Sequence, residues 1–301
     1  MNRRRRRLCG SGIAAASVLL VACSSVRVTT PAVADPTNPF RSGHTLVIPH
    51  GGGDGLFPED TIYAFEHSLA MGGEVVDVDV ALSAEGVPVA VHDATVDATT
   101  DGTGAVRSKT IAELQSLDAG YRFTIDGRQP FRGMGLRIPT LREILERFPD
   151  VLVSLDLKDL GTDIIQPVCD LLRNEHALAR SFVGSDGDDQ IVEFRRRCPD
   201  VRTSANLPDA RALWAAAAAV DAAFAPAATI DQPPYQAGGR TLVTKQRLSY
   251  AHAHGVAVLT WVVDDEATLR TLVEMGVDGI YTRYPDRLAK IVASYRKAHG
   301  R

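Results

Sequence analysis

The sequence lacks an excess of charge of either sign, because 33 Lys and Arg face 37 Asp and Glu, a formal net charge of −4. Nothing in that balance indicates binding to nucleic acid, which favours strongly basic chains. Cysteine is scarce, with four residues in 301, and a chain of this length can bury a large core without disulfide staples. The hydrophobic fraction of 45% and the charged fraction of 23% are ordinary for globular proteins, which excludes disordered, collagen and coiled-coil chains.

Long hydrophobic runs are also missing. The run Gly12–Ala22 (GIAAASVLLVA) has about half of the roughly 20 residues that a membrane-spanning helix needs. It follows the basic block Arg3–Arg7 and precedes Cys23, an order typical of a secretory signal peptide. Residues 20–23 (LVAC) resemble the lipobox of bacterial lipoproteins, in which the cysteine is acylated and becomes the new N-terminus. A plain signal peptide cleaved elsewhere is the alternative.

Three segments are therefore predicted: a signal peptide over 1–22, a lipidated tether rich in Ser, Thr and Pro over 23–44, and one folded domain over 45–301. Loss of the signal peptide removes five arginines and no acid, so the mature chain has 28 basic and 37 acidic residues, a net charge of −9. We expect an exported protein, either a cell-envelope lipoprotein anchored in the membrane through Cys23 or a secreted one. Cys169 and Cys198 then remain, and they either pair or stay as buried thiols.

Apolar, β-branched runs alternate with amphipathic stretches from residue 45 onward. The predicted strands are 45–50, 74–82, 151–157, 181–185, 201–205, 222–230, 256–263 and 278–282. The predicted helices are 60–71, 140–148, 163–178, 188–197, 208–220, 244–254, 265–275 and 285–298. Alternation indicates parallel strands, because parallel neighbours need a long crossover. The sequence therefore predicts an α/β fold, a (β/α)8 TIM barrel, with a doubly wound open sheet as the alternative.

One further run, 87–92 (VPVAVH), follows the second strand after only four residues. That loop is too short for a parallel crossover, so we predict a small antiparallel hairpin inserted after the second strand and returning toward the barrel mouth. The register expected from this loop length places Asp79 opposite Ala90 and Asp77 opposite His92. An imidazole would then lie beside two carboxylates.

Carboxylates fall near the ends of two predicted strands. Asp77 and Asp79 are two residues apart, so their side chains share one face of the strand. Two charges on an apolar strand are costly unless they are compensated, and a hard divalent cation with oxygen ligands would do so. A solvated pair on an edge strand is the alternative. Asp156 and Lys158 repeat the spacing near the end of another strand, where catalytic groups of such barrels collect, although such a pair can also be purely structural.

Two histidines occupy predicted positions at the barrel mouth. His50 ends the first strand and runs into Gly51–Gly53, where glycines allow close backbone approach and an anion-binding nest. His92 ends the hairpin, and together the two imidazoles indicate general acid–base catalysis. The remaining histidines of the folded domain are expected on helix surfaces: His67, His176, His252, His254 and His299.

These residues are the first elements of an ordered set of short motifs. The set reads His50-Gly51-Gly52, Pro58-Glu59-Asp60-Thr61, Asp77-x-Asp79, His92-Asp93, Thr99 to Gly104, Asp156-x-Lys158, Trp261 to Asp264 and Asp278-Gly279-Ile280. In this order it resembles the glycerophosphodiester phosphodiesterase family, over about residues 46–290. The resemblance implies metal-dependent hydrolysis of a small-molecule glycerophosphodiester to glycerol 3-phosphate and an alcohol, through a cyclic phosphate formed by the glycerol 2-hydroxyl.

The resemblance also implies roles for individual residues. His50 and His92 would be the general base and acid, and Asp77, Asp79 and Asp156 would bind Ca²⁺ or Mg²⁺. The implied substrate-binding residues are Glu59, Lys158, Trp261 and Gly51.

The chain departs from the family pattern at several of these positions. The arginine of the first motif is Gly51 here, and two metal-binding glutamates are Asp77 and Asp156. Loss of the arginine removes a bidentate phosphate clamp. Two other functions therefore stay open. One is a sphingomyelinase D-like or lysophospholipase D-like phospholipase on the same barrel plan, and the other is a catalytically impaired lipoprotein that binds phosphodiesters.

Overall fold

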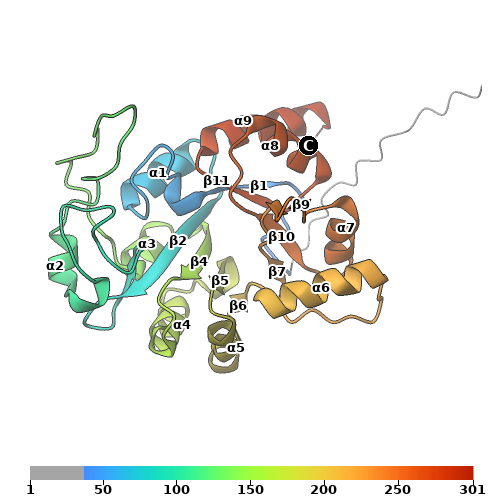
Figure 1. The fold of residues 1–301 in the computed structure, drawn as a ribbon, viewed down its shortest axis with the longest axis horizontal. Coiled ribbons are helices and arrows are strands. Elements are labelled where there is room, and N and C mark those ends of the chain that lie inside the picture. The colour runs from blue at the N-terminus through green and yellow to red at the C-terminus, as the bar shows by residue number, and fades with distance from the viewer. Residues whose placement is uncertain (1–36, 301) are drawn as a thin grey trace, which may run out of the picture.

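The computed structural model describes residues 37–300, and its central feature is a closed parallel barrel (Figure 1). The barrel strands are β1 (Leu46–Pro49), β2 (Val75–Leu82), β4 (Leu152–Leu157), β5 (Ser181–Ser185), β6 (Arg202–Thr203), β7 (Ile230–Asp231), β10 (Ala257–Thr260) and β11 (Gly279–Thr282). They form two hydrogen-bonded sheets, β2-β4-β5-β6 and β1-β11-β10-β7. A parallel bridge from Ser204 to Ile230 joins β6 to β7, and Glu74 N donates to Val47 O at the seam between β1 and β2. The predicted (β/α)8 barrel is confirmed.

Helices surround the strands on all sides in Figure 1. They are α1 (Ile62–Ala70), α3 (Leu141–Arg147), α4 (Ile165–Asn174), α5 (Asp188–Arg197), α6 (Leu207–Ala219), α7 (Lys245–Ala253), α8 (Glu266–Met275) and α9 (Pro285–Ala298). Capping explains several starts: the Thr61 side chain accepts from Ala64 N, and Thr140 and Asn206 form capping boxes. Among residues 37–300, none of the helices has the length and apolar character required to cross a bilayer.

The expected strand over 222–230 is wrong except at its last residue. α6 ends at Ala219, its C-cap Val220 adopts a left-handed conformation, and turns and irregular backbone follow until β7 begins at Ile230. The intervening residues are rich in alanine, which has low strand propensity. The structure adds an exposed hairpin, β8 (Gln236–Ala237) and β9 (Arg240–Thr241), that was not predicted.

The predicted hairpin after the second strand is present, but its register differs by one residue. β3 (Pro88–Ala90) pairs antiparallel with β2, with Leu82 opposite Pro88 and Val80 opposite Ala90. The shift arises because Val87 belongs to the turn, where its N–H donates to the Ser83 hydroxyl. His92 therefore lies beyond β3 and is not paired with Asp77, contrary to the expected register.

A long insertion, residues 91–139, follows β3 and lies to the left of the barrel in Figure 1. It contains the 3-10 turn Val106–Ser108 and α2 (Ile111–Gln115). Phe131 of the insertion packs against the rings of Phe57 and Tyr63. The insertion thereby attaches to the loop that carries the first motif.

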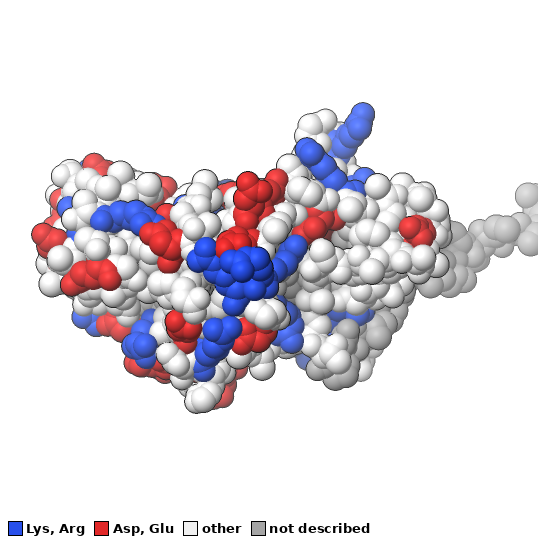
Figure 2. Space-filling model, turned by 90° about the horizontal axis from the view of Figure 1, so that it is seen from below, with Lys and Arg blue, Asp and Glu red and all other residues white. Residues whose placement is uncertain are grey.

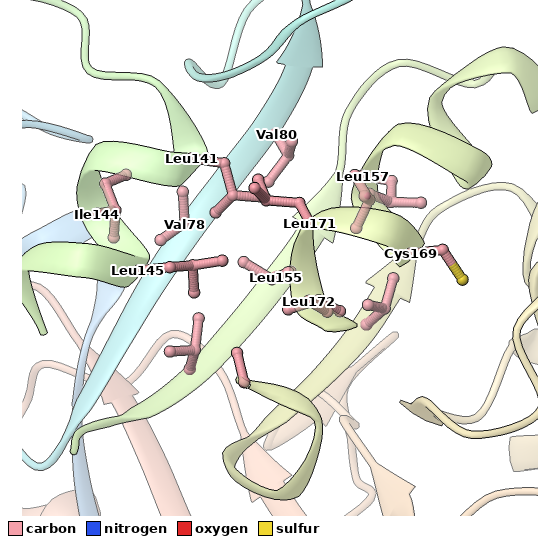
Figure 3. Packing of buried hydrophobic residues seen from close by; sticks show 14 of the residues in the cluster. Val78, Val80, Leu141, Ile144, Leu145, Leu155, Leu157, Cys169, Leu171 and Leu172 are labelled. Carbon is pink, nitrogen blue, oxygen red and sulfur yellow. The ribbon is translucent and has the colours of Figure 1, made fainter. Parts of the chain in front are cut away.

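The hydrophobic core has two layers. Figure 3 shows the outer layer, where Val78 and Leu155 on the strands meet Leu145 and Leu172 on α3 and α4. The inner layer fills the barrel and includes Phe40, which is fully buried with its ring centroid 4.8 Å from that of Phe182. Residues 37–44 fall in the predicted tether, yet the stretch around Phe40 packs as part of the barrel. The predicted signal peptide and Cys23 lie outside the described residues.

Cys169 of α4 and Cys198, directly after α5, form a disulfide with a Cα–Cα distance of 6.2 Å. Of the two alternatives left open by the sequence, the structure therefore contains the paired form. The face built by α4 to α6 carries mixed charges, with basic side chains gathered near the middle of Figure 2 and acidic ones beside them. Arg196 and Arg197 of α5 both pair with Glu193, as is common for exposed helical charges.

Candidate active site

The loop after β1 turns back over the barrel mouth on three glycines. His50 begins the 3-10 turn His50–Gly52, and Gly51, Gly52 and Gly53 have φ angles of 52°, 85° and 89°, which favour glycine. A Cβ at Gly52 would lie only 2.8 Å from the Cβ of Ala64. The close packing of this turn against α1 therefore also requires glycine at this position. The turn lets Gly51 N donate to Asp77 Oδ2 at 3.2 Å.

Asp77 and Asp79 lie on the inner face of β2, and the register places Asp79 beside Asp156 on β4. Both aspartates are buried, with 8% and 9% of the residue surface exposed. Burial raises the pKa of Asp77 to about 7, with Asp79 adding repulsion and His50 acting in the opposite direction. Asp77 and Asp79 therefore share one face of β2, as their spacing predicts, and Asp156 lies beside Asp79 on the neighbouring strand.

Lys158 reaches into this acidic group. Its Nζ lies 2.6 Å from Asp156 Oδ2 and 3.3 Å from Asp79 Oδ1. Burial lowers the pKa of Lys158, but the charges of Asp156 and Asp79 outweigh that effect and raise it above its usual value. The lysine is therefore a fixed cation within the site.

His50 has a carboxylate partner that sequence reasoning missed. Its Nδ1 lies 3.3 Å from Oδ2 of Asp54, and the two side chains are 32% and 20% exposed. Burial lowers the pKa of His50, but Asp54, Asp77 and Asp79 together raise it to about 9. No motif contains Asp54, so only its position four residues after His50 in a tight turn could have suggested it.

Glu59 and His92 line one small pocket between the first-motif loop and the insertion. The pocket lining comprises Glu59, Asp60, Ala90, Val91, His92, Thr99, Ala119 and Ile138. Burial raises the pKa of Glu59, while His92 lowers it. His92 Nδ1 lies 2.8 Å from Asp93 Oδ1, with nearly half of the imidazole exposed.

Asp60 is the most enclosed acid of this pocket. It has a left-handed φ of 55°, and its Oδ1 accepts from Asp79 N at 3.1 Å. Its Oδ2 is buried without a hydrogen-bond partner among the described residues. Burial and the neighbouring charges of Asp79 and Glu59 raise the pKa of Asp60 well above its usual value.

A neutral network lies beneath the acids. The Tyr281 hydroxyl is 3.0 Å from Ser154 Oγ and accepts from Gln232 Nε2 at 2.7 Å. Trp261, predicted as a substrate contact, is 45% exposed and donates from Nε1 to Gln232 O at 2.5 Å. Ser154 precedes Asp156 by two residues and therefore shares its face of β4. This spacing is the one feature of the sequence that could have indicated the network.

The acid of the late D-G-I motif does not join the site. Asp278 precedes β11 and accepts from Val258 N at 2.8 Å and from His252 Nε2 at 2.7 Å. It is fully buried at the end of the barrel opposite the mouth, so its role is structural. His252, expected on the surface, is only 15% exposed as a result.

The donor chemistry of the mouth fits a hard divalent cation, because the buried Asp77 and Asp79 and the partly exposed Asp156 offer carboxylate oxygens. A cation would offset the burial and the repulsion from Asp79 that raise the pKa of Asp77. Among residues 37–300, however, no three His, Cys, Asp or Glu side chains are arranged as a preformed cage. Lys158 lies between two of the candidate ligands.

Comparison with known proteins points to one family. The sequence model of the glycerophosphoryl diester phosphodiesterase family matches residues 50–287. A glycerophosphodiester phosphodiesterase of Bacillus subtilis (strain 168) is 27% identical over 302 residues, covering 94% of this chain and 98% of that protein.

Solved structures agree with that match. The crystal structure of a glycerophosphodiester phosphodiesterase from Agrobacterium tumefaciens has a TM-score of 0.66 at 26% identity and covers 82% of this chain and 99% of that one. An Oleispira antarctica phosphodiesterase, solved in complex with the product sn-glycerol-3-phosphate, has a TM-score of 0.67 at 24% identity, covering 84% and 99%. The matched segment contains every residue assigned to the mouth above.

Proposed function

The chain belongs to the glycerophosphoryl diester phosphodiesterase family, whose members are phosphoric diester hydrolases, and we propose that it cleaves glycerophosphodiesters with two histidines and a divalent cation. The observation that carries this proposal is the convergence of His50, Asp77, Asp79 and Lys158 on one buried edge of the barrel. The product-bound Oleispira antarctica neighbour supports sn-glycerol 3-phosphate as the product.

The two histidines would share the proton transfers of this reaction. Asp54 lies beside His50 and Asp93 beside His92, so a carboxylate orients each imidazole. One histidine would take the proton from the glycerol hydroxyl as it attacks phosphorus, and the other would give a proton to the leaving alkoxide. Lys158 would hold a non-bridging phosphate oxygen, and Trp261 would contact the substrate beside it.

Asp77, Asp79 and Asp156 would hold Ca²⁺ or Mg²⁺. Bound there, the cation would act as a Lewis acid that stabilises charge on the phosphoryl oxygens. Glu59, whose pKa is raised by burial, is close enough to His92 to support either the phosphate or the cation.

We also propose export with a lipid anchor on Cys23. The basic block, the short apolar run and the LVAC sequence support this, and so does the Cys169–Cys198 disulfide, because disulfides persist in oxidising compartments. Labelling of bacterial cells with an alkyne palmitate analogue tests the anchor: the wild type should be labelled and Cys23→Ser should not. Labelling that survives the substitution would refute it.

Turnover of glycerophosphocholine by three matched variants tests the proposed chemistry. Asp79→Asn and His50→Ala should each lower kcat/KM by at least about 100-fold, as expected for loss of a charged or proton-transferring group. Glu274→Gln removes an acid on the exposed end of α8 and should leave the rate unchanged. Near-native turnover in His50→Ala, or faster release of choline from lysophosphatidylcholine than from glycerophosphocholine, would contradict the proposal.

A further inference from the structure

Arg283 is a cation at the barrel mouth to which no role has yet been assigned. It follows β11, which pairs in parallel with β1 so that Ile48 lies beside Tyr281 and Pro49 beside Thr282. Arg283 directly follows this last pair, close to the point where His50 begins the 3-10 turn. Its carbonyl oxygen accepts from Gly55 N at 3.2 Å, which ties it to the loop that carries Asp54.

Asp264 holds the Arg283 side chain at this position. Arg283 Nε donates to Asp264 Oδ2 at 2.6 Å, and Asp264 Oδ1 accepts from Arg283 N at 2.9 Å and from Thr282 Oγ1 at 3.0 Å. The two terminal nitrogens of the guanidinium donate to no other group within residues 37–300. The side chain is 53% exposed, so its two terminal nitrogens are accessible to a ligand.

The other cations at the mouth are already engaged with carboxylates. His50 faces Asp54, and Lys158 is shared by Asp79 and Asp156. A phosphodiester brings a negative charge into this acidic surrounding, so a further cation at the mouth would favour its binding. The residue after His50 is Gly51, which supplies no side chain.

We propose that Arg283 binds the non-bridging phosphate oxygens of the substrate through its two terminal nitrogens, with Asp264 as the residue that positions it. This rests on the proposed function and adds a phosphate-binding residue to it. A planar guanidinium offers parallel donors that match two phosphate oxygens, whereas an ammonium acts as a point charge. The side chain thus supplies a cation at a mouth where Gly51 supplies none.

Steady-state kinetics with glycerophosphocholine test Arg283 directly. Arg283→Met should lower kcat/KM by about 10- to 100-fold, the effect of losing a charge-assisted hydrogen-bonded contact, mostly through KM. Arg283→Lys should lose less, because the charge remains. The control Arg296→Met removes an exposed arginine from the last turn of α9 and should match the wild type.

Asp264→Asn separates binding from a structural role. It keeps the cation at the mouth but loosens its position, so a phosphate-binding Arg283 predicts a clearly smaller loss of kcat/KM for Asp264→Asn than for Arg283→Met. An Arg283 that serves only to anchor Asp264 predicts equal losses in both variants. Equal losses, or an Arg283→Met value within twofold of an active wild type, would overturn the inference and leave the proposed function standing.

If the wild type shows no turnover, the role of Arg283 can still be tested by binding. Isothermal titration calorimetry would compare the affinities of wild type and Arg283→Met for sn-glycerol 3-phosphate. Weaker binding by Arg283→Met than by wild type, by about tenfold or more, would support Arg283 as the anion contact although the proposed activity has failed. Equal binding by the two proteins, or no binding by the wild type, would overturn the inference.

Discussion

Removal of Asp54 should change the protonation of His50. The pair is separated by 3.3 Å, and two unit charges at that distance interact by about 1.3 kcal/mol in water and about 5 kcal/mol at an effective dielectric constant of about 20. Because His50 and Asp54 are 32% and 20% exposed, solvent screening favours the lower part of this range. Asp54→Asn should therefore lower the pKa of His50 from about 9 by about one to two pH units.

The sign of the stability effect follows from the raised pKa. The favourable interaction is fully present below the usual histidine pKa of 6.5 and is lost as the pH rises through about 9. Asp54→Asn should therefore destabilise the fold at pH 6 and have little effect at pH 10, about one unit above the folded-state value. An NMR titration of the imidazole in protein stripped of metal with a chelator measures the pKa directly.

Asp93→Asn is the matched control, because Asp93 contacts His92 and not His50. That variant should leave the His50 titration where it is in the wild type. The reasoning is refuted if wild-type His50 titrates near 6.5, or if Asp54→Asn leaves its midpoint unchanged.

Three further predictions concern stability. Asp60→Asn should raise the free energy of unfolding by about 1 to 3 kcal/mol at pH 8 in the presence of chelator, because the amide keeps the bond to Asp79 N and removes a buried charge. This gain should shrink as the pH falls toward and below the unfolded-state pKa of 3.8, where the carboxyl group becomes neutral in both states; a gain independent of pH in urea titrations would contradict it. Reduction of the Cys169–Cys198 disulfide, which closes a loop with a sequence separation of 29, should cost about 3.5 kcal/mol, and an unchanged urea midpoint would argue against it. Phe40→Ala should cost about 3 to 5 kcal/mol, against less than about 0.5 kcal/mol for the exposed Leu207→Ala; equal costs would show that the segment around Phe40 does not belong to the core.

The barrel could be predicted because its strands are buried on both faces and alternate with amphipathic helices of regular length. The same reasoning failed for 222–230, where alanines carry neither strand propensity nor a clear period, and only Ile230 and Asp231 form a strand. It also failed for the hairpin register, because the Ser83 hydroxyl draws Val87 into the turn. A single hydrogen bond of this kind leaves no trace in the pattern of apolar residues, so the register could not be predicted from that pattern.

The candidate site, too, could be predicted only in part, better for the residues on strands than for those in loops. The shared face of Asp77 and Asp79 could be predicted because strand spacing fixes which side chains point the same way. Their grouping with Asp156 was implied by the family resemblance, and the register places Asp156 beside Asp79. Asp54 and Arg283 were missed because they lie in loops. Their positions depend on how β1 pairs with β11 and on the path of a glycine turn, neither of which is encoded in local spacing.

The most direct measurement of the central claim is a ³¹P NMR time course of glycerophosphocholine with the purified protein, with and without a chelator. The phosphodiester signal should be replaced by that of sn-glycerol 3-phosphate. The chelator should slow conversion by at least about 100-fold, and excess Ca²⁺ or Mg²⁺ should restore it. Persistence of the phosphodiester in the presence of added cation, appearance of phosphocholine instead, or a rate that the chelator leaves unchanged would contradict the account.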